Sequence, residues 1–207
     1  MITIYSSDSM GVRGNCLYPY RHEVTDAAGL REAVKHDYVC AEYKNSYRSG
    51  GNFITSNCLG MDCDNDHTDH AHEWITPDDV RHNFPDVPLA IHFSRHHMKP
   101  KDQKSARPRF HCLFAIEPTT DVKAYADMKA RLNALFPYFD AQALDGARFF
   151  FGTDNPEVDF FPGTITLDEC LERYYPEEDS FANLPDGTPQ AVSYTHLRAH
   201  ETCADLV

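Results

Sequence analysis

The sequence has no run of apolar residues long enough to cross a membrane, and its first residues lack the basic stretch and apolar core of a signal peptide. It contains seven cysteines but no Cys-x-x-Cys pair, which is typical of reduced thiols in the cytosol. It also lacks an excess of positive charge, because the formal net charge is −13. This charge argues against sequence-independent coating of DNA, so any contact with nucleic acid must come from a local basic patch. We expect a cytoplasmic protein with one sizeable domain and no membrane contact.

Two acidic residues stand two positions apart in a stretch that reads as a strand. In residues 59–66, Leu59, Met61 and Cys63 point to one face, and Asp62 and Asp64 point to the other. The two carboxylates then lie about 7 Å apart along the strand, at roughly 3.3 Å per residue. Carboxylates this close repel each other unless positive charge lies between them, and a hard divalent cation such as Mg²⁺ suits them. The same pattern also fits a strand that ends in an acidic turn.

A basic segment follows and leads directly into another predicted strand. Residues 95–109 hold six Lys or Arg and one Asp, a local charge of +5 in an acidic chain. Such a run is either a solvated loop or a site for phosphates. In the strand over residues 109–116, Phe110 and Cys112 share one face and His111 lies on the other. A histidine at the start of a strand after a basic loop is well placed to donate a hydrogen bond to a phosphate oxygen.

Hydrophobic periodicity places further elements along the chain. Other strands are predicted over residues 1–5, 38–43, 53–64 and 88–94, with a short strand that begins at Arg148. Helices are predicted over residues 26–36, from Pro77 to before Pro85, from Thr119 or Thr120 to before Pro137, and from Thr166 to about Tyr175. Helical spacing in the third of these helices predicts a core face made of Val122, Tyr125, Met128, Leu132 and Leu135.

Two further groups of polar residues carry possible chemistry. After the third helix, Phe139-Asp140 places an acid behind an apolar residue, and Asp145 follows five positions later. Arg148 is either a phosphate contact or a buried partner for one of these acids. The loop after Asp64 contains several histidines, which could bind zinc but match no common structural zinc spacing, so a solvated loop is the main expectation. The histidines concerned are His67, His70 and His72.

The order of these motifs resembles the archaeo-eukaryotic primase, or primase-polymerase, superfamily. An acid-x-acid strand, a later histidine after a basic loop, and a third acid after an apolar residue occur in that order over about residues 1–175. The resemblance is closest to primase domains carried by phages, plasmids and other mobile elements. It extends to Ser94-Arg95-x-His97-Met98-Lys99, Arg107-Pro108-Arg109-Phe110-His111 and Ala147-Arg148-Phe149-Phe150-Phe151-Gly152.

This resemblance implies an α/β (α+β) fold, in which helices flank an RRM-like mixed or antiparallel sheet. It also implies that Asp62, Asp64 and Asp140 bind Mg²⁺ or Mn²⁺, with Asp145 as the alternative third ligand. His111 would contact the phosphates of the incoming nucleotide. Arg109 departs from the family pattern, which usually has a small residue two positions before the histidine. The cations that would contact triphosphate or template phosphates are Lys99, Lys101, Lys104, Arg107, Arg109 and Arg148.

The function implied is DNA-directed nucleotidyl transfer, as a primase or a primer-extending polymerase of a mobile element in a bacterial cytoplasm. Three carboxylates can hold the two metal ions that such a reaction needs, and most of the catalysis is positioning and charge neutralisation. The expected partners are a single-stranded DNA template, nucleoside triphosphates and a helicase. The sequence does not distinguish ribonucleotides from deoxyribonucleotides.

The end of the chain carries a different resemblance. Residues 192–202 look like one reading frame of a sequencing-library adapter, so we expect residues 192–207 to be a non-native tail. Residues 176–191 are acidic, contain proline and resemble a linker after a catalytic domain over residues 1–175. The natural protein would then continue beyond about Ala191, and a helicase domain would be lost by this truncation.

Two other function classes remain open. A rolling-circle replication initiator or relaxase needs two histidines around one apolar residue, whereas this chain has Arg109-Phe110-His111. Tyr125 and Lys129 would have to be its nucleophile and helper, yet Tyr125 is predicted on the core side of its helix. A non-catalytic nucleic-acid-binding module is the third class, and its difficulty is that carboxylates without a metal repel phosphate.

Overall fold

The longest alternating segments of the chain build a five-stranded antiparallel sheet. The computed structural model describes residues 1–142 and 144–176. Two strands in the middle of this sheet carry apolar residues on both faces, and residues buried on both faces need a layer on each side. In the order β4-β5-β7-β6-β9 the strands are Glu42–Tyr43, Phe53–Cys63, Phe110–Thr119, Leu89–Phe93 and Val158–Phe161.

A second, four-stranded sheet covers one face of the first. Tyr38 and Phe150 reach from it into a core that also contains Leu113 and Ala90 of the five-stranded sheet. Helix α1 (Ala27–Ala33) closes this core with Leu30. In the order β2-β1-β3-β8 the strands are Tyr20–Val24, Ile2–Ser6, Tyr38–Val39 and Phe149–Phe150.

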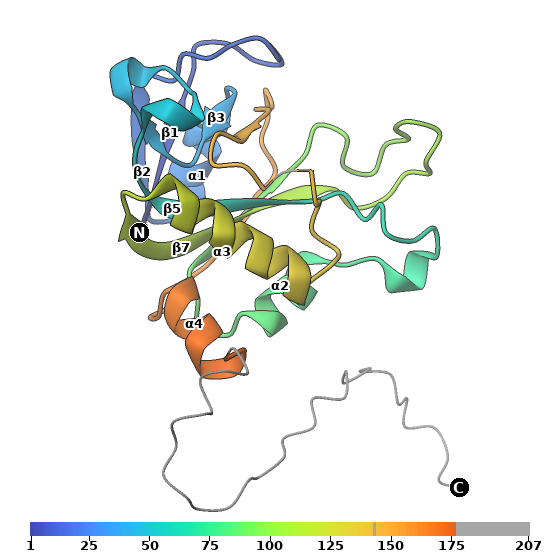
Figure 1. Ribbon diagram of the computed structural model, residues 1–207. Coiled ribbons are helices and arrows are strands. Elements are labelled where there is room, and N and C mark those ends of the chain that lie inside the picture. The colour runs from blue at the N-terminus through green and yellow to red at the C-terminus, as the bar shows by residue number, and fades with distance from the viewer. Residues whose placement is uncertain (143, 177–207) are drawn as a thin grey trace, which may run out of the picture. The chain divides into compact units, whose positions relative to one another are not determined.

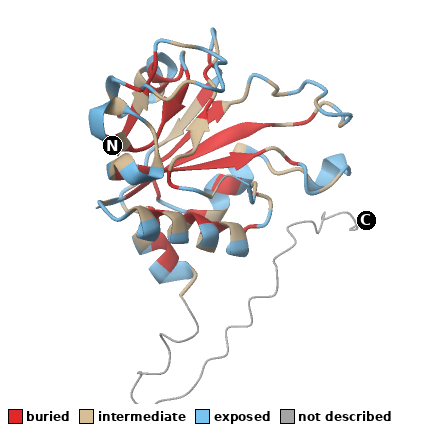
Figure 2. Cartoon of the chain, turned by 45° about the horizontal axis from the view of Figure 1, so that its top comes forward, coloured by how far each residue is buried: buried red, intermediate tan, exposed pale blue. Residues whose placement is uncertain are grey.

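Three helices cover the opposite face of the five-stranded sheet, as Figure 1 shows for α3 and α4 below β5 and β7. Their apolar residues meet Leu59, Met61 and Phe114 in a second core. Figure 2 shows the result, with the long strands in the middle of the fold largely buried and the outer surfaces of the helices exposed. The helices are α2 (Pro77–Asn83), α3 (Val122–Leu135) and α4 (Leu167–Tyr174), and short 3-10 turns occur at Lys44–Ser46, Gly50–Asn52 and Ala71–Glu73.

Side-chain caps define where the helices begin. Thr76 and Thr166 each form a capping box, with Asp79 and Glu169 respectively, as the sequence predicted for Thr166. Helix α3 is capped by Asp121, which accepts from the backbone N–H groups of the first turn. The prediction that this helix begins with a cap at Thr119 or Thr120 was therefore wrong, because β7 continues to Thr119 and the cap is Asp121.

The predicted α+β fold with an antiparallel sheet flanked by helices is confirmed. The order β5-β7-β6, with α2 between β5 and β6 and α3 after β7, reproduces three strands of the RRM arrangement. The place beside β5 that the last RRM strand would take is occupied by β4, and the next strand after α3 joins the other sheet.

Some predicted elements differ from the structure. The single strand predicted over residues 38–43 is divided into β3 and β4, which pair in different sheets. Strands β2 and β9 were not predicted, because their sequences lack a clear alternation of apolar residues. Leu135 is 39% exposed rather than in the core, since it lies in the last turn of α3. Within the described residues, no helix is both long and apolar enough to cross a bilayer. The predictions for residues 177–207 lie outside those that the structure describes.

Candidate functional site

Three polar residues lie side by side across the middle of the five-stranded sheet. In β5 and β7, Asp62 is paired with His111, and His111 is paired in turn with His92 of β6. Paired residues in an antiparallel sheet project from the same face, and here that face is the one covered by the second sheet. Tyr38 of β3 reaches them from that second sheet. We call Asp62, His111, His92 and Tyr38 the histidine row.

Asp62 is the charged end of the histidine row. Its side chain is 8% exposed, its Oδ1 lies 3.3 Å from His111 Nε2, and its Oδ2 accepts a hydrogen bond from Arg148 Nη2. Burial raises the pKa of Asp62, and the Arg148 guanidinium acts in the opposite direction. The acid that pairs with Arg148 is thus Asp62, whereas the sequence analysis considered Asp140 or Asp145 as the acidic partner of Arg148.

The two histidines share the hydroxyl group of Tyr38. The Tyr38 Oη lies 3.0 Å from His111 Nδ1 and 3.1 Å from His92 Nδ1. On its other side, His92 Nε2 lies 3.2 Å from the hydroxyl oxygen of Thr153. Burial lowers the pKa of His111 to about 3 and the pKa of His92 well below its ordinary value. The row therefore holds both rings in the neutral form at physiological pH.

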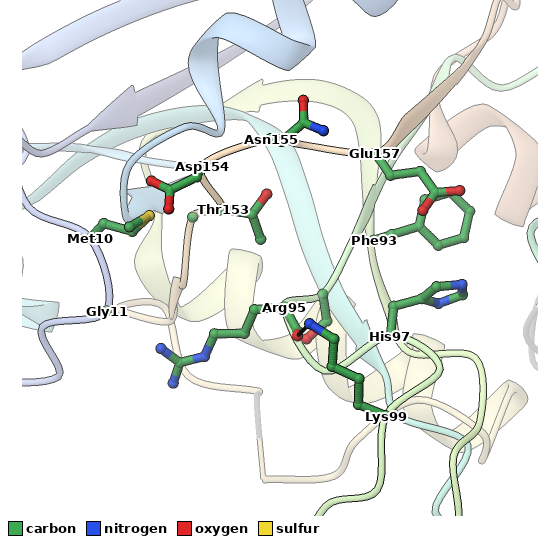
Figure 3. Close-up of a pocket in the computed structure, with 12 residues that line it drawn as sticks. Met10, Gly11, Phe93, Arg95, His97, Lys99, Thr153, Asp154, Asn155 and Glu157 are labelled. Carbon is green, nitrogen blue, oxygen red and sulfur yellow. Dashed lines mark hydrogen bonds between the residues drawn. The ribbon is translucent and has the colours of Figure 1, made fainter.

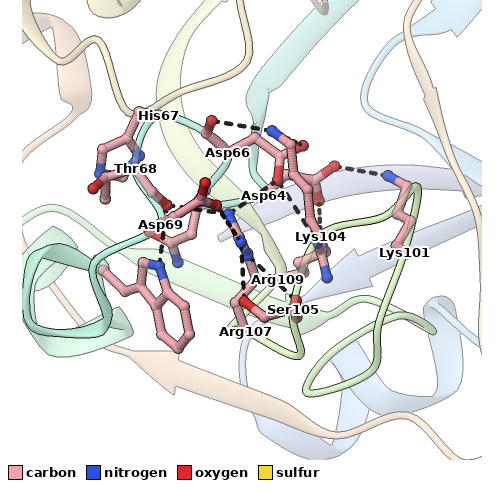
Figure 4. A network of polar contacts seen from close by, with 12 residues as sticks. Asp64, Asp66, His67, Thr68, Asp69, Lys101, Lys104, Ser105, Arg107 and Arg109 are labelled. Carbon is pink, nitrogen blue, oxygen red and sulfur yellow. Dashed lines mark hydrogen bonds and ion pairs between the residues drawn. The ribbon is translucent and has the colours of Figure 1, made fainter.

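Asp64 lies beyond the end of β5, in a network of ion pairs with the basic segment (Figure 4). Lys101 Nζ is 2.9 Å from Asp64 Oδ2, and Arg109 Nε is 3.8 Å from Asp64 Oδ1. Further along the turn, Asp66 faces three cations at 3.3–3.7 Å, and Arg107 Nη2 is 2.7 Å from Asp69 Oδ1. We call this set the ion-pair network: Asp64, Asp66 and Asp69 with Lys101, Lys104, Arg107 and Arg109.

The two arginines of the ion-pair network are buried, with 1% exposure for Arg107 and 0% for Arg109. Both also donate to backbone carbonyls, Arg107 to Asn65 at 2.9 Å and Arg109 to Lys99 at 3.0 Å. They tie the basic segment to the acidic turn, and a phosphate can reach them only if these ion pairs open. The local charge of +5 is thus largely matched by acids from another part of the chain.

The lysines of the basic segment are more accessible. The side chains of Lys101 and Lys104 keep 32% and 37% exposure despite their ion pairs. Lys99 is exposed, and its Nζ donates to the carbonyl of Arg95 at 3.2 Å. These three lysines, together with Arg148 at 33% exposure, are the cations of the predicted set that a phosphate group can approach from solvent.

Asp140 is held against Asp62 by the backbone. The Asp140 N–H donates to the Asp62 carbonyl at 2.9 Å, while the Asp140 carboxylate accepts from Gln142 N at 2.8 Å. Asp145 instead accepts from Ala147 N at 2.7 Å. Of the two alternatives for a third acid, Asp140 is therefore the one with a direct link to the acid-x-acid strand.

A cavity of 470 Å³ opens beside the histidine row (Figure 3). Its lining combines cations of the basic segment, among them Arg95 and Lys99, with acids such as Asp154 and Glu157. Thr153 also lines it and joins it to the histidine row through His92. The cavity and the row therefore meet at one side chain.

A buried carboxylate holds the loops around this cavity. Asp37 is 0% exposed and accepts from Gly11 N at 2.8 Å, from Val12 N at 2.9 Å and from Gly152 N at 3.0 Å. Gly152 is required there, because a Cβ atom would lie 2.4 Å from the backbone carbonyl of His36. This close approach fixes the position of the neighbouring Thr153.

The donor chemistry at Asp62 and Asp64 fits a hard divalent cation. Both are carboxylates, they lie two residues apart where β5 ends, and each already faces a positive side chain, namely Arg148 and Lys101. Among the residues that the structure describes, no group of three or more His, Cys, Asp or Glu side chains is arranged to hold a metal ion. His67, His70 and His72 lie in the exposed loop and its 3-10 turn, where His67 Nε2 is 3.3 Å from the carbonyl of Glu73.

Comparison with known proteins gives one distant likeness to report. No protein-family profile matches the sequence, and no curated protein matches it. Among solved structures, the chain is similar to the AEP domain of the cyanophage S-2L primase-polymerase, with 17% sequence identity and a TM-score of 0.44. The similarity covers 83% of this chain and 88% of that domain. The site is therefore interpreted from its own residues.

The sequence analysis missed Tyr38, His92 and Thr153. One signal was present for His92: it is the one strongly polar residue in Leu89–Phe93, and it alternates with Leu89 and Ile91 in the same way that His111 alternates with its apolar neighbours. No comparable signal existed for Tyr38 or Thr153, because their partners are 54 to 73 residues away along the chain.

Proposed function

We propose that this chain is a nucleotidyltransferase of the primase-polymerase type, which extends a strand along a DNA template. One observation carries the proposal: residues from three separate sequence motifs meet at Asp62. His111 faces its carboxylate, Asp140 bonds to its carbonyl, and Arg148 bonds to its carboxylate. Motifs far apart in sequence that converge on one residue are typical of a site rather than of independent surface features.

Each residue has a role in this proposal. Asp62 and Asp64 would hold Mg²⁺ or Mn²⁺, with Asp140 as the third carboxylate. When bound, two such ions activate the attacking hydroxyl group and neutralise the triphosphate. His111 would donate Nε2–H to a phosphate oxygen, since it lies at the same end of the strand pair as Asp62.

The exposed cations would bind the charged substrates. Lys99, Lys101 and Lys104 lie on the segment between β6 and β7, beside the acid-x-acid strand. Positive charge at this position would attract triphosphate and the backbone of single-stranded DNA, which an acidic chain would otherwise repel. We also propose that a helicase acts with this domain, and that it works in the cytoplasm of a bacterial host of a phage or plasmid.

The proposal is tested with single-stranded DNA template, labelled nucleotides and Mg²⁺ or Mn²⁺. We expect metal-dependent primer synthesis or extension. The rate of product formation should fall at least about 100-fold in Asp62→Asn and in Asp64→Asn, because losing a residue that only supports a metal ligand already costs up to about 100-fold. Asp127→Asn is the matched control, because it makes the same chemical change on the exposed surface of α3. No product from the unaltered chain, or full activity in both site variants, would overturn the proposal.

The structure gives no support to a nicking enzyme that uses Tyr125. This tyrosine is 3% exposed, and its hydroxyl donates to the Cys58 carbonyl at 3.0 Å. Burial raises its pKa, which disfavours the nucleophilic phenolate. A covalent adduct between protein and DNA after incubation with single-stranded DNA would be the result that favours nicking instead.

A further inference from the structure

We propose that the cavity of 470 Å³ beside the histidine row selects ribonucleotides: Asp154 and Glu157 accept hydrogen bonds from the sugar, and Arg95 contacts the phosphates. The identity of the ligand as a nucleotide rests on the proposed function. The sequence analysis gave no role to these three residues and left the choice between ribonucleotides and deoxyribonucleotides open.

The cavity is lined by charges of both signs, which come from different segments. Arg95 and Lys99 belong to the segment after β6, whereas Asp154 and Glu157 belong to the segment before β9. Figure 3 shows the two acids above the two cations. Among the residues that the structure describes, none of these four side chains forms an ion pair. Unlike the ion-pair network, the cavity keeps its opposite charges apart, so both are available to a ligand.

Arg95 is held at the cavity by stacking rather than by an acid. Its guanidinium carbon lies 3.9 Å from the centre of the Phe151 ring. Its Nη1 also passes close to Gly11, where a Cβ atom would lie 3.0 Å from it and where a φ of +75° favours glycine. Stacking uses the flat face of a guanidinium group, so the N–H groups at its edge can donate to phosphate oxygens.

The cationic side of the cavity adjoins the proposed metal ligands. Arg109 joins the two, since its Nη1 donates to the Lys99 carbonyl at 3.0 Å and its Nε lies 3.8 Å from Asp64 Oδ1. The acidic side lies toward β9, three strands from β5 in the sheet order, or about 14 Å at about 4.8 Å per strand. A nucleotide with its phosphates at the cations near Asp64 therefore extends its nucleoside toward Asp154 and Glu157.

The acidic side of the cavity suits groups that donate hydrogen bonds. An ionised carboxylate only accepts hydrogen bonds and repels phosphate, so this side receives the nucleoside. Carboxylates recognise ribose in dinucleotide-binding sites by accepting from its 2′-hydroxyl group, a donor that deoxyribose lacks. Phe93 and His97, whose ring centroids are 4.6 Å apart, add aromatic surface on which a base can stack.

The first experiment compares the binding of ATP and dATP to the full chain by titration calorimetry. Mg²⁺ is present and DNA is left out, so that no template directs synthesis. We expect ATP to bind about 10-fold more tightly, the lower end for a hydrogen bond to a charged group, because Asp154 and Glu157 are exposed. GTP and dGTP should show the same ratio, since they differ by the same hydroxyl group. Equal affinities for the ribose and deoxyribose forms would overturn the inference.

The second experiment removes the two kinds of contact separately. The double variant Asp154→Ala/Glu157→Ala should bind ATP and dATP equally, because both lose the carboxylate acceptors. Arg95→Ala should weaken the binding of both nucleotides by about fivefold and leave their ratio unchanged, as expected for an exposed contact between charges. A preference for ATP that persists in the double variant, or nucleotide affinities that are unchanged in Arg95→Ala, would contradict the inference.

Matched control variants lie on α4, which contributes no residue to the lining of the cavity. Glu172→Ala removes an exposed acid, and Arg173→Ala removes an exposed arginine that also lies over an aromatic ring, that of Tyr174. Both should bind the nucleotides as the unaltered chain does. Loss of the preference for ATP in Glu172→Ala would show that net charge sets the preference, which would overturn the role of the cavity.

Binding and synthesis together separate this inference from the proposed function. A chain that prefers ATP through Asp154 and Glu157 but makes no product on a DNA template would refute the proposed function alone. A chain that makes product but binds ATP and dATP equally would refute the inference alone.

Discussion

The histidine row and the ion-pair network both lie where β5 ends and β7 begins, but they stabilise the protein in different ways. The row is buried and largely neutral, and its one ion pair joins Asp62 to Arg148. The network places three acids against four cations, and several of its side chains keep contact with solvent. The histidine row thus depends on buried hydrogen bonds, whereas the ion-pair network depends on the balance of opposite charges.

Burial explains the difference. In the row, a group that loses its partner keeps no access to water, so each single change has a large cost. In the network, water and salt can replace a lost partner at the exposed lysines, so the cost there is small. The lysines of the ion-pair network can therefore exchange their acidic partners for phosphates, whereas the side chains of the histidine row keep a fixed geometry.

The largest effect on stability is expected from Arg148→Met, which would break the row at its charged end. It leaves the Asp62 carboxylate buried without its cation, and we expect the free energy of unfolding to fall by about 2–3 kcal/mol, less than for a fully buried pair because Arg148 is 33% exposed. Urea denaturation measures it. Asp62→Asn in the same chain should recover part of the loss. Arg21→Ala, in an exposed pair with Glu23, is the control with little change.

The second largest effect on stability is expected from a change of pH, which acts on the histidine row through His111. Unfolded histidine gains a proton near pH 6.5, while burial lowers the pKa of His111 to about 3 in the folded chain. Between these two pH values the unfolded chain binds a proton that folded His111 does not. The contribution of this residue to the free energy of unfolding is therefore complete above about pH 6.5 and is lost as the pH falls toward 3. Between pH 7 and pH 5 we expect a loss of about 1–2 kcal/mol in the free energy of unfolding from this residue.

This pH dependence is measured by urea denaturation at several pH values. The slope should be smaller in His111→Gln, which cannot take up a proton. His70→Gln should keep the slope of the unaltered chain, because His70 is exposed in the loop. Equal slopes in all three chains would show that the row does not hold His111 neutral.

The smallest effect is expected in the network. Lys101→Ala removes the ammonium group that lies 2.9 Å from Asp64 and competes there with any other cation. We expect stability to change by less than about 1 kcal/mol and the affinity for Mn²⁺ to rise by about fivefold. Titration calorimetry measures the affinity, and Lys123→Ala on the exposed surface of α3 is the control. Weaker Mn²⁺ binding by the Lys101 variant would argue against Asp64 as a metal ligand.

Parts of the site could be predicted from the sequence because they depend on neighbours within one strand. Alternation places Leu59, Met61 and Cys63 in the core and Asp62 on the opposite face, as found. The same rule correctly separates His111 from Phe110. The basic segment was also visible as a charge contrast, but its partners were not. Arg107 and Arg109 were expected to face phosphates, yet they are buried against acids some forty residues away.

What the sequence determined alone is local: the faces of the long strands, the starts of the helices that follow Thr76 and Thr166, and the position of Asp62 on one strand face. What only the tertiary structure decided is which distant groups meet those faces. Strand register set His92 beside His111, and the second sheet brought Tyr38 over both. The physical reason is that alternation acts between neighbours along a strand, whereas hydrogen bonds and ion pairs depend on how strands and loops pack.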